Sequence, residues 1–410
     1  MSHAPHAAAP VGLKVLLLEN VHASAHELLR EAGCEVEGFT GALSEEELTA
    51  RIKGVHVLGI RSKTQVTASV LAAADSLITL GCFCIGTNQV NLDAAAARGV
   101  TVFNAPFSNT RSVAELIIAE VVMLARQLGD RSREVHAGTW SKVAAGCYEV
   151  RGKTLGIIGY GHIGAQVGVL AESMGMRVVF YDVISKLPMG NNHALGSLNE
   201  LLEQSDFVTL HVPATPQTRD MIGAAEIARM RRGAFLLNAS RGTVVDIPAL
   251  ADALRAGRLG GAAIDVFPQE PATNSDPFRS ELQGLPNVIL TPHIGGSTIE
   301  AQASIGREVA TSLLKYLDQG ATTGSVNFPN VELAPSRGTH RVLNVHKNVP
   351  GVMKEINRIV SDTGANIHAQ ILSTDPTIGY LIMDIERDVS EAVRAGMSLL
   401  PTNIRTRVVY

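Results

Sequence analysis

The chain has 410 residues, of which 46% are hydrophobic and 18% are charged, and its formal net charge at pH 7 is −4. The length indicates two or three domains, and the composition is typical of a globular protein and not of a disordered one. The net charge gives no sign of a basic surface that would bind nucleic acid or an anionic membrane. The most apolar helical stretch, 113–128, contains Glu115, Glu120 and Arg126, so no transmembrane segment is expected. We therefore expect a cytoplasmic protein whose first ten residues form a loose tail and not a secretion signal.

The four cysteines give no sign of a disulfide framework, because they are few and widely spaced along the chain. Cys82 and Cys84 have a single residue between them and no matching Cys or His pair elsewhere, which does not fit a metal motif. We expect buried, reduced thiols and no bound metal.

The first part of the chain alternates short β-branched runs with helical stretches. Strands are predicted over 15–18, 55–60, 77–80 and 100–102, and a helix over 26–32. A second and stronger series predicts strands over 155–158, 178–181, 207–211, 234–238, 262–266 and 288–290, followed by a long helix over 298–317. Strands that alternate with helices indicate parallel sheets covered on both faces, and the second series matches a doubly wound nucleotide-binding sheet.

Residues 320–339 are rich in Thr, Gly, Ser, Asn and Pro without periodicity, which predicts a linker. Beyond it the predicted order is strand 342–346, helix 352–363, strands 366–372 and 380–385, helix 390–399 and strand 404–409. This is the βαββαβ order of a ferredoxin-like domain. The expected fold class is thus α/β, with two doubly wound parallel-sheet domains (flavodoxin-like and Rossmann) and a C-terminal ferredoxin-like domain, in which residues 378–385 offer an edge for pairing with another copy.

A G-x-G-x-x-G motif follows the first strand of the second series and precedes a helix. Gly159 permits the tight turn, Gly161 lets a pyrophosphate approach the backbone, and Gly164 lets the helix pack closely on its strand. Asp182 ends the next strand about twenty residues later, where a carboxylate accepts the ribose hydroxyls of NAD and repels the 2′-phosphate of NADP. The motif in this context predicts NAD as the cofactor.

Polar side chains follow several later strands of the same sheet, at the edge where open α/β sheets bind their ligands. Oxidation of a 2-hydroxy acid needs a base, a cation for the carboxylate, and an acid that orients the base. His293 is the candidate base, and Arg241 is the candidate cation that binds the carboxylate. Glu270 would accept the second ring N–H of His293, and Asp265 is expected near the nicotinamide. A single His or Arg is more often structural, but their placement at successive strand ends of one sheet favours catalysis.

This set of residues on this scaffold resembles the D-isomer-specific 2-hydroxy acid dehydrogenase family, and residues 81–90, 104–115 and 293–298 resemble its bacterial phosphoglycerate dehydrogenases. The resemblance extends over nearly the whole chain. It implies a substrate-binding domain at 11–107 and 296–330, an NAD-binding Rossmann domain at 108–295, and a regulatory ACT domain at 339–410. It also implies NAD-dependent oxidation of 3-phosphoglycerate to 3-phosphohydroxypyruvate, the first step of phosphorylated L-serine biosynthesis, in a homotetramer with Trp140 in a subunit contact.

The motif and the resemblance together give a set of cofactor-binding candidates: Gly159, Gly161, His162, Ile163, Gly164, Asp182, Ala239, Ser240, Arg241, Asp265, His293, Ile294, Gly295 and Gly296. The substrate's phosphate needs local cations, and the best group is Arg61-Ser62-Lys63 after the strand 55–60, with Asn109 and Lys142 as further candidates. The alternative for Arg61 to Lys63 is an ordinary solvated loop. The bacterial relatives carry Arg where this chain has Lys63, so a point charge replaces a two-pronged donor.

The resemblance further implies that His346, Asn348 and Asn366 bind L-serine as a feedback effector, because an amino acid needs both donors and acceptors. The alternative is that the asparagines only form turns. Arg337-Gly338 stands where relatives have a Gly-Gly hinge, and Arg restricts the backbone there. Serine is expected to lower activity by biasing domain closure.

Two rival functions remain at this stage. One is another dehydrogenase of the same family, acting on D-lactate, glycerate or formate, and the other is a non-catalytic NAD-sensing protein. The presence of Arg241, Glu270 and His293 argues against the second.

Overall fold

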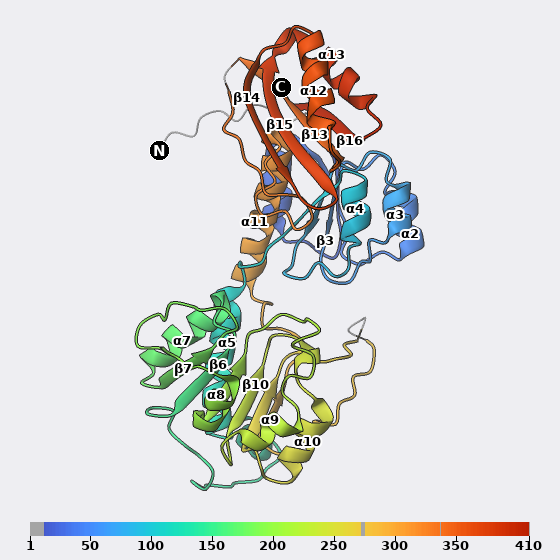
Figure 1. Cartoon of the computed structure of the whole chain (residues 1–410). Helices are drawn as coiled ribbons and strands as arrows, with labels where there is room; N and C mark the ends of the chain where they lie inside the picture. Colours follow the sequence, from blue (N-terminus) through green and yellow to red (C-terminus); the bar gives the residue numbers. More distant parts are fainter. Residues whose placement is uncertain (1–11, 272–274, 337, 410) are drawn as a thin grey trace. The chain divides into compact units, whose positions relative to one another are not determined.

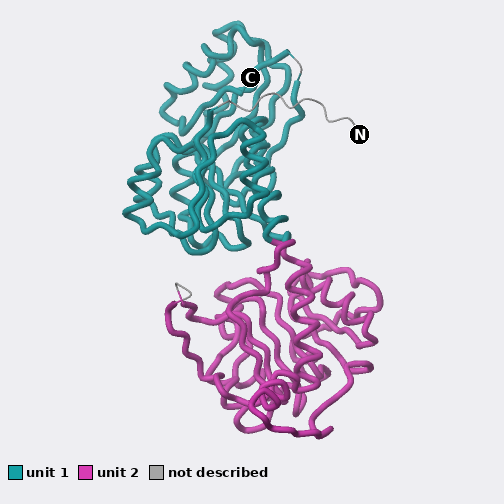
Figure 2. The backbone as a smooth tube through the Cα atoms, turned by 180° about the vertical axis from the view of Figure 1, so that it is seen from behind, with its two compact units in different colours: residues 1–108, 302–410 teal, residues 109–301 magenta. Residues whose placement is uncertain are grey.

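The computed structural model describes residues 12–271, 275–336 and 338–409 (Figure 1). The expected N-terminal tail and Arg337 lie outside these residues. The chain forms two compact units: one comprises the described parts of Met1–Ser108 and Gln302–Tyr410, and the other the described parts of Asn109–Ala301 (Figure 2). Among the described residues, no helix is long and apolar enough to cross a membrane.

The first unit contains a five-stranded parallel sheet in the order β2-β1-β3-β4-β5, a flavodoxin-like arrangement. Its strands are β1 (Lys14–Leu17), β2 (Glu35–Gly38), β3 (Val57–Ile60), β4 (Thr79–Cys82) and β5 (Thr101–Asn104). Its helices are α1 (Ala23–Glu31), α2 (Glu45–Arg51), α3 (Ala68–Ala73) and α4 (Leu92–Ala97). The sequence did not predict β2, because this edge strand is largely exposed and carries Glu35 and Glu37.

The long helix α11 (Ile299–Gln319) leads to a second, antiparallel sheet in the order β14-β15-β13-β16. Its elements are β13 (Thr339–Lys347), α12 (Val352–Asp362), β14 (Ile367–Thr374), β15 (Ile378–Glu386), η2 (Arg387–Val389), α13 (Ser390–Ser398) and β16 (Asn403–Val409). The predicted βαββαβ order is confirmed. The expectation that residues 378–385 offer a free edge is wrong, because β15 pairs with β14 on one side and β13 on the other.

The segment predicted as a linker packs into the first unit. Phe328 and Val331 are buried in a core that also contains Tyr316 of α11 and Tyr380 of β15. The Tyr380 hydroxyl donates a hydrogen bond of 2.6 Å to the carbonyl of Gly320. The linker prediction is therefore corrected: the burial of Phe328 and Val331 fixes the segment, although so few apolar side chains form no extended periodic series.

The second unit is a seven-stranded parallel sheet in the order β12-β11-β10-β9-β6-β7-β8. Its strands are β6 (Thr154–Ile158), β7 (Arg177–Tyr181), β8 (His193–Ala194), β9 (Phe207–Leu210), β10 (Phe235–Asn238), β11 (Gly261–Ile264) and β12 (Val288–Leu290). Its helices are α5 (Thr110–Ala125), α6 (Leu128–His136), α7 (His162–Ser173), α8 (Leu198–Gln204), α9 (Ala224–Arg229), η1 (Gly242–Val244) and α10 (Ile247–Arg255). The strand order reverses between β6 and β9, the switch point at which ligands bind to such sheets.

Candidate active site

The glycine motif forms the turn between β6 and α7, and its geometry demands glycine. Gly159 has a φ of 89°, and a Cβ there would lie 2.3 Å from the carbonyl oxygen of His211. A Cβ on Gly164 would lie 2.2 Å from the carbonyl oxygen of Gly159. A Cβ on Gly161 would instead meet no atom within 4 Å, so the backbone at this position is open to a ligand.

Asp182 stands beside this turn, directly after β7. One carboxylate oxygen accepts the N–H of Tyr160 at 2.8 Å and the other accepts the N–H of Ile184 at 3.0 Å. The acid is thus fixed where the sequence predicted it. An open glycine, the N-terminus of α7 and an acid at the neighbouring strand end fit the ADP-ribose half of NAD.

His293 and Glu270 form a hydrogen-bonded pair after β12 and β11. The Nδ1 of His293 donates to a Glu270 carboxylate oxygen at 2.9 Å, and the other oxygen accepts the N–H of Phe267 at 3.1 Å. The His293 side chain is 52% exposed. Because Nδ1 is engaged, Nε2 is the ring atom that can meet a substrate.

Each member of the pair shifts the pKa of the other. The hydrogen bond that His293 donates to Glu270 raises the pKa of His293, against an opposing effect of burial, and the charges of Glu270 and Asp265 raise it further. Burial tends to raise the pKa of Glu270, but the hydrogen bond and charge of His293, the Phe267 N–H and the Arg241 guanidinium together lower it. The arrangement therefore stabilises an imidazolium next to a carboxylate.

Asp265 holds the loop on both sides of His293, through a side chain before it and through the backbone after it. The residue is 1% exposed, and its carboxylate accepts the Thr291 hydroxyl at 2.6 Å and the N–H groups of Ile294 and Gly295, both at 2.8 Å. His293 itself has a φ of 53°, in the left-handed region that non-glycine residues seldom adopt. Sequence reasoning expected Asp265 near the nicotinamide and missed its bonds to the His293 loop.

Arg241 lies on the turn after β10, and the buried Asn238 shapes that turn. The Asn238 carboxamide oxygen accepts the Ser240 N–H at 3.0 Å and the Ser240 hydroxyl at 2.8 Å, while its amide group donates to the Arg241 carbonyl at 3.0 Å. A Cβ on Gly242 would lie 2.0 Å from the carbonyl carbon of Phe267, so the segments that carry Arg241 and Glu270 are in contact. The sequence placed Asn238 at a strand end but gave it no role.

The phosphate-binding candidates belong to both units. Ser62 and Lys63 are exposed and Arg61 is half-buried in the turn after β3 of the first unit. Lys142 is an exposed residue of the second unit. Asn109 is buried at the start of α5 against Gly296, where it supports the backbone beyond His293.

The three effector candidates differ in accessibility. His346 is 3% exposed, and its Nδ1 lies 2.8 Å from the side-chain oxygen of Asn344. Burial lowers the pKa of His346. Asn348 and Asn366 are exposed, and the Asn348 amide group donates to the carbonyl of Asp375 at 2.6 Å.

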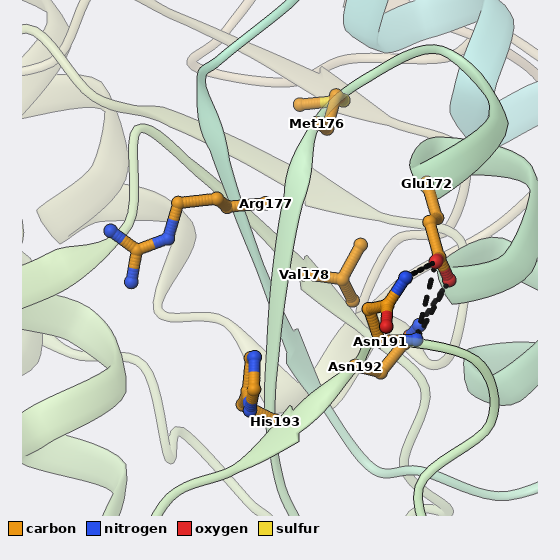
Figure 3. Close-up of a pocket in the computed structure, with 7 residues that line it drawn as sticks. All are labelled: Glu172, Met176, Arg177, Val178, Asn191, Asn192 and His193. Carbon is orange, nitrogen blue, oxygen red and sulfur yellow. Dashed lines mark hydrogen bonds between the residues drawn. The ribbon is translucent and has the colours of Figure 1, made fainter.

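Figure 3 shows a separate cavity, of about 200 Å³, at the start of β7. Asp182 follows the other end of this strand. Its lining comprises Glu172, Met176, Arg177, Val178, Asn191, Asn192 and His193. Dashed lines in Figure 3 mark hydrogen bonds from Asn191 and Asn192 to the Glu172 carboxylate. These hydrogen bonds occupy the Glu172 carboxylate. Because the glycine turn lies near the other end of β7, the cavity is distinct from the cofactor-binding edge of the sheet.

Two parts of the chain match family models. Residues 118–295 match the NAD binding domain of the D-isomer specific 2-hydroxyacid dehydrogenases, and residues 343–404 match the AHAS small subunit-like ACT domain. The first match contains the glycine turn, Arg241, Glu270 and His293.

Similar proteins extend the likeness over almost the whole chain. A D-3-phosphoglycerate dehydrogenase of Dictyostelium discoideum is 54% identical over 398 residues, 97% of each chain, and that of Escherichia coli K12 is 55% identical over 401 residues, 97% of this chain and 98% of the relative. Among solved structures, a Thermus thermophilus protein aligns with a TM-score of 0.68 and 34% identity, covering 74% of this chain and 97% of that one. A D-2-hydroxyisocaproate dehydrogenase aligns with a TM-score of 0.69 and 25% identity, covering 77% of this chain and 100% of its own.

Proposed function

Because this chain belongs to the D-isomer-specific 2-hydroxyacid dehydrogenase family, in its D-3-phosphoglycerate dehydrogenase branch, we propose that it oxidises 3-phosphoglycerate to 3-phosphohydroxypyruvate with NAD. This reaction is the first step of the phosphorylated route to L-serine. The observation that carries the proposal is the His293–Glu270 pair, whose segment contacts that of Arg241, on a sheet whose glycine turn fits NAD.

Each side chain has one task in the reaction. Arg241 binds the substrate carboxylate through two parallel N–H donors. The Nε2 of His293 takes the proton of the 2-hydroxyl group, and Glu270 stabilises the resulting imidazolium through Nδ1. NAD, held by the glycine turn and Asp182, would supply the acceptor for the hydride of C2. The product is a 2-oxo acid, and the half-exposed His293 returns its proton to water.

The cofactor and the substrate are held by different segments. Gly159, Gly161, His162, Ile163, Gly164 and Asp182 bind the ADP-ribose half of NAD, and the segments 239–241, 265 and 293–296 face its nicotinamide half. Arg61, Ser62 and Lys63 bind the phosphate, with Lys142 as a further cation. In this scheme residues 11–107 and 296–330 form the substrate-binding domain, 108–295 the NAD-binding domain and 339–410 the ACT domain.

L-Serine is the proposed effector of the ACT domain. Asn348 and Asn366 offer exposed amide groups, while His346 supports the site from a buried position. In the proposed cytoplasmic homotetramer, serine at millimolar concentration lowers the initial rate. A rate that does not change across a serine titration contradicts this part of the proposal.

The main test is NADH formation from 3-phosphoglycerate, compared with D-lactate, D-glycerate and formate and with NADP in place of NAD. His293→Ala is expected to lower kcat at least about a hundredfold, because a positioned general base contributes that much or more. The matched control is His193→Ala, an exposed histidine beside the cavity of Figure 3, which leaves the rate unchanged. A His293→Ala enzyme at the parent's rate refutes the mechanism, and NAD binding without turnover of any acid favours the NAD-sensing alternative.

A further inference from the structure

The turn that carries Arg61 and Lys63 is built around a buried carboxylate. Glu19 follows β1 and is 7% exposed. One of its oxygens accepts the backbone N–H groups of Arg61 at 3.2 Å and Thr64 at 2.8 Å, and the other accepts that of Lys63 at 2.9 Å. Backbone N–H groups that converge in this way usually form a binding site for an external anion. Here the anion is part of the protein.

A second side chain holds the same turn from its carbonyl side. Gln89 is 3% exposed, and its amide group donates to the Arg61 carbonyl at 2.6 Å. The backbone carbonyl of Gln89 in turn accepts the N–H of Val66 at 2.8 Å. The N–H and the C=O of Arg61 are therefore both fixed, by Glu19 and Gln89 respectively.

The backbone around Glu19 is also unusual. Glu19 and Asn20 have φ values of 62° and 54°, two consecutive non-glycine residues in the left-handed region. Their N–H groups donate to the carbonyls of Gly41 at 3.0 Å and Phe39 at 2.9 Å, which fixes this conformation. Such conformations persist only where the surroundings determine them, and they concentrate at functional sites.

Two consequences follow for an anion that reaches this turn. The N–H groups of Arg61, Lys63 and Thr64 already bond Glu19, so the anion meets side chains instead of a backbone cradle. The negative charge of Glu19 also repels an anion. The role of Glu19 at this turn is therefore to set the backbone geometry, and not to attract the anion electrostatically.

We propose that Glu19 is a positioning residue for phosphate recognition. Its carboxylate fixes the backbone of residues 61–64, and the side chains of Arg61 and Lys63 on this turn then select a phosphorylated 2-hydroxy acid. This inference rests on the proposed function, which places the substrate phosphate at these two residues.

The test is Glu19→Gln, which keeps the size of the side chain but turns an amide N–H₂ group toward a backbone N–H. The measured quantity is the ratio of kcat/KM for 3-phosphoglycerate to kcat/KM for D-glycerate. The ratio is expected to fall about tenfold, mainly through KM for the phosphorylated acid, because at least one of the three N–H groups loses its acceptor and the remaining bonds lose their charge assistance. If charge alone mattered, removing a negative group near an anion site would raise the ratio. A fall in the ratio therefore indicates positioning, and a rise indicates a purely electrostatic effect. Should D-glycerate turnover be too slow to measure, the same rise in KM at nearly constant kcat serves as the readout.

Other variants separate this inference from the proposed function. Arg61→Ala and Lys63→Ala each lower the ratio if the phosphate binds here, and if neither does, the proposed phosphate site fails whatever Glu19→Gln shows. If both lower it while Glu19→Gln leaves it unchanged or raises it, the positioning role is wrong. The matched control is Asp75→Asn, which alters a carboxylate that accepts the Gly54 N–H at 2.8 Å in the same unit and leaves the ratio unchanged.

Gln89→Met provides an independent measurement if Glu19→Gln does not fold. It removes the amide group that donates to the carbonyls of Arg61 and Gly86 and leaves every charge in place. The ratio is expected to fall in the same direction, and a folded Gln89→Met enzyme with the parent's ratio overturns the inference.

Discussion

Replacing Asp265 by Asn tests whether the loop that carries His293 must be held rigidly for catalysis. In the parent, the Asp265 carboxylate accepts three hydrogen bonds, from the Thr291 hydroxyl and from the N–H groups of Ile294 and Gly295. The amide oxygen of Asn can still accept the bonds from Thr291 and Ile294. The new N–H₂ group, however, faces the N–H of Gly295, which loses its acceptor.

The magnitude follows from these three bonds. One buried N–H left without a partner costs about 1–3 kcal/mol, and weakening each of the other two from charge-assisted to neutral costs roughly 0.5–1.5 kcal/mol. The total of about 2–6 kcal/mol exceeds the cost of about 1–3 kcal/mol for holding a non-glycine residue in a rare backbone conformation. The backbone of His293, whose φ is 53°, is therefore expected to leave the left-handed region for a more common conformation. Because a displacement of about 1 Å at a reacting group can cost about a hundredfold in rate, kcat/KM should fall by about that factor.

The assay is NADH formation from 3-phosphoglycerate, measured together with the melting temperature of the variant. Thr291→Val is the control, since it removes the hydroxyl donor but leaves the carboxylate and its two N–H partners, and it should retain kcat/KM within about threefold. A folded Asp265→Asn enzyme whose kcat/KM stays within that range would refute the view that this clamp sets the position of the base.

Three further predictions concern charge. Glu270→Gln removes the negative charge that raises the pKa of His293 and leaves at most a neutral acceptor for its Nδ1–H; since oxidation requires the neutral imidazole, the acidic limb of the kcat/KM profile should move to lower pH, and a move to higher pH contradicts the pairing. Asp182→Ser should raise the preference for NADP over NAD by about tenfold or more in steady-state assays, because the carboxylate no longer repels the 2′-phosphate. Asp384→Asn leaves the buried Arg341 guanidinium without its charged partner and should lower the free energy of unfolding in urea by about 3–5 kcal/mol.

A control for the last prediction is available in the same sheet domain. Glu355→Gln breaks an exposed pair with Arg358 at 2.7 Å, and such pairs contribute less than about 1 kcal/mol. If Asp384→Asn changes the unfolding free energy no more than this control does, the buried pair does not stabilise the sheet.

Local patterns predicted much of the fold. Six of the seven strands that the structure describes in the second unit were predicted, because each carries a short apolar run, and the glycine turn with Asp182 indicated NAD. β2 and the two-residue β8 were missed, because their side chains are mostly exposed and give no apolar run. Residues 320–339 were taken for a linker because a few isolated apolar residues can be buried without leaving a periodic pattern in the sequence.

The candidate site divides in the same way. His293, Glu270 and Arg241 could be proposed from the sequence because they follow successive strands of one sheet. The bonds that backbone N–H groups donate to Asp265 and Glu19 were not predicted. The partners of Glu19, for example, lie more than forty residues away in sequence, and only the folded chain brings them together. Burial of His346 was missed for a similar reason, because it depends on how β13 pairs with β15.

The first unit is assembled from two segments between which the entire second unit is inserted, and this has a consequence for how the protein matures. Leu17 and Val57 share their core with Val309 and Leu313 of α11, which the ribosome delivers only after the whole inserted unit. During synthesis, residues 12–108 therefore keep an uncovered apolar face until α11 is made, whereas the inserted unit is continuous in sequence and can fold as soon as it is complete. Refolding of the intact chain should accordingly end with a slow closure of this discontinuous core, the stage most exposed to aggregation and most dependent on chaperones.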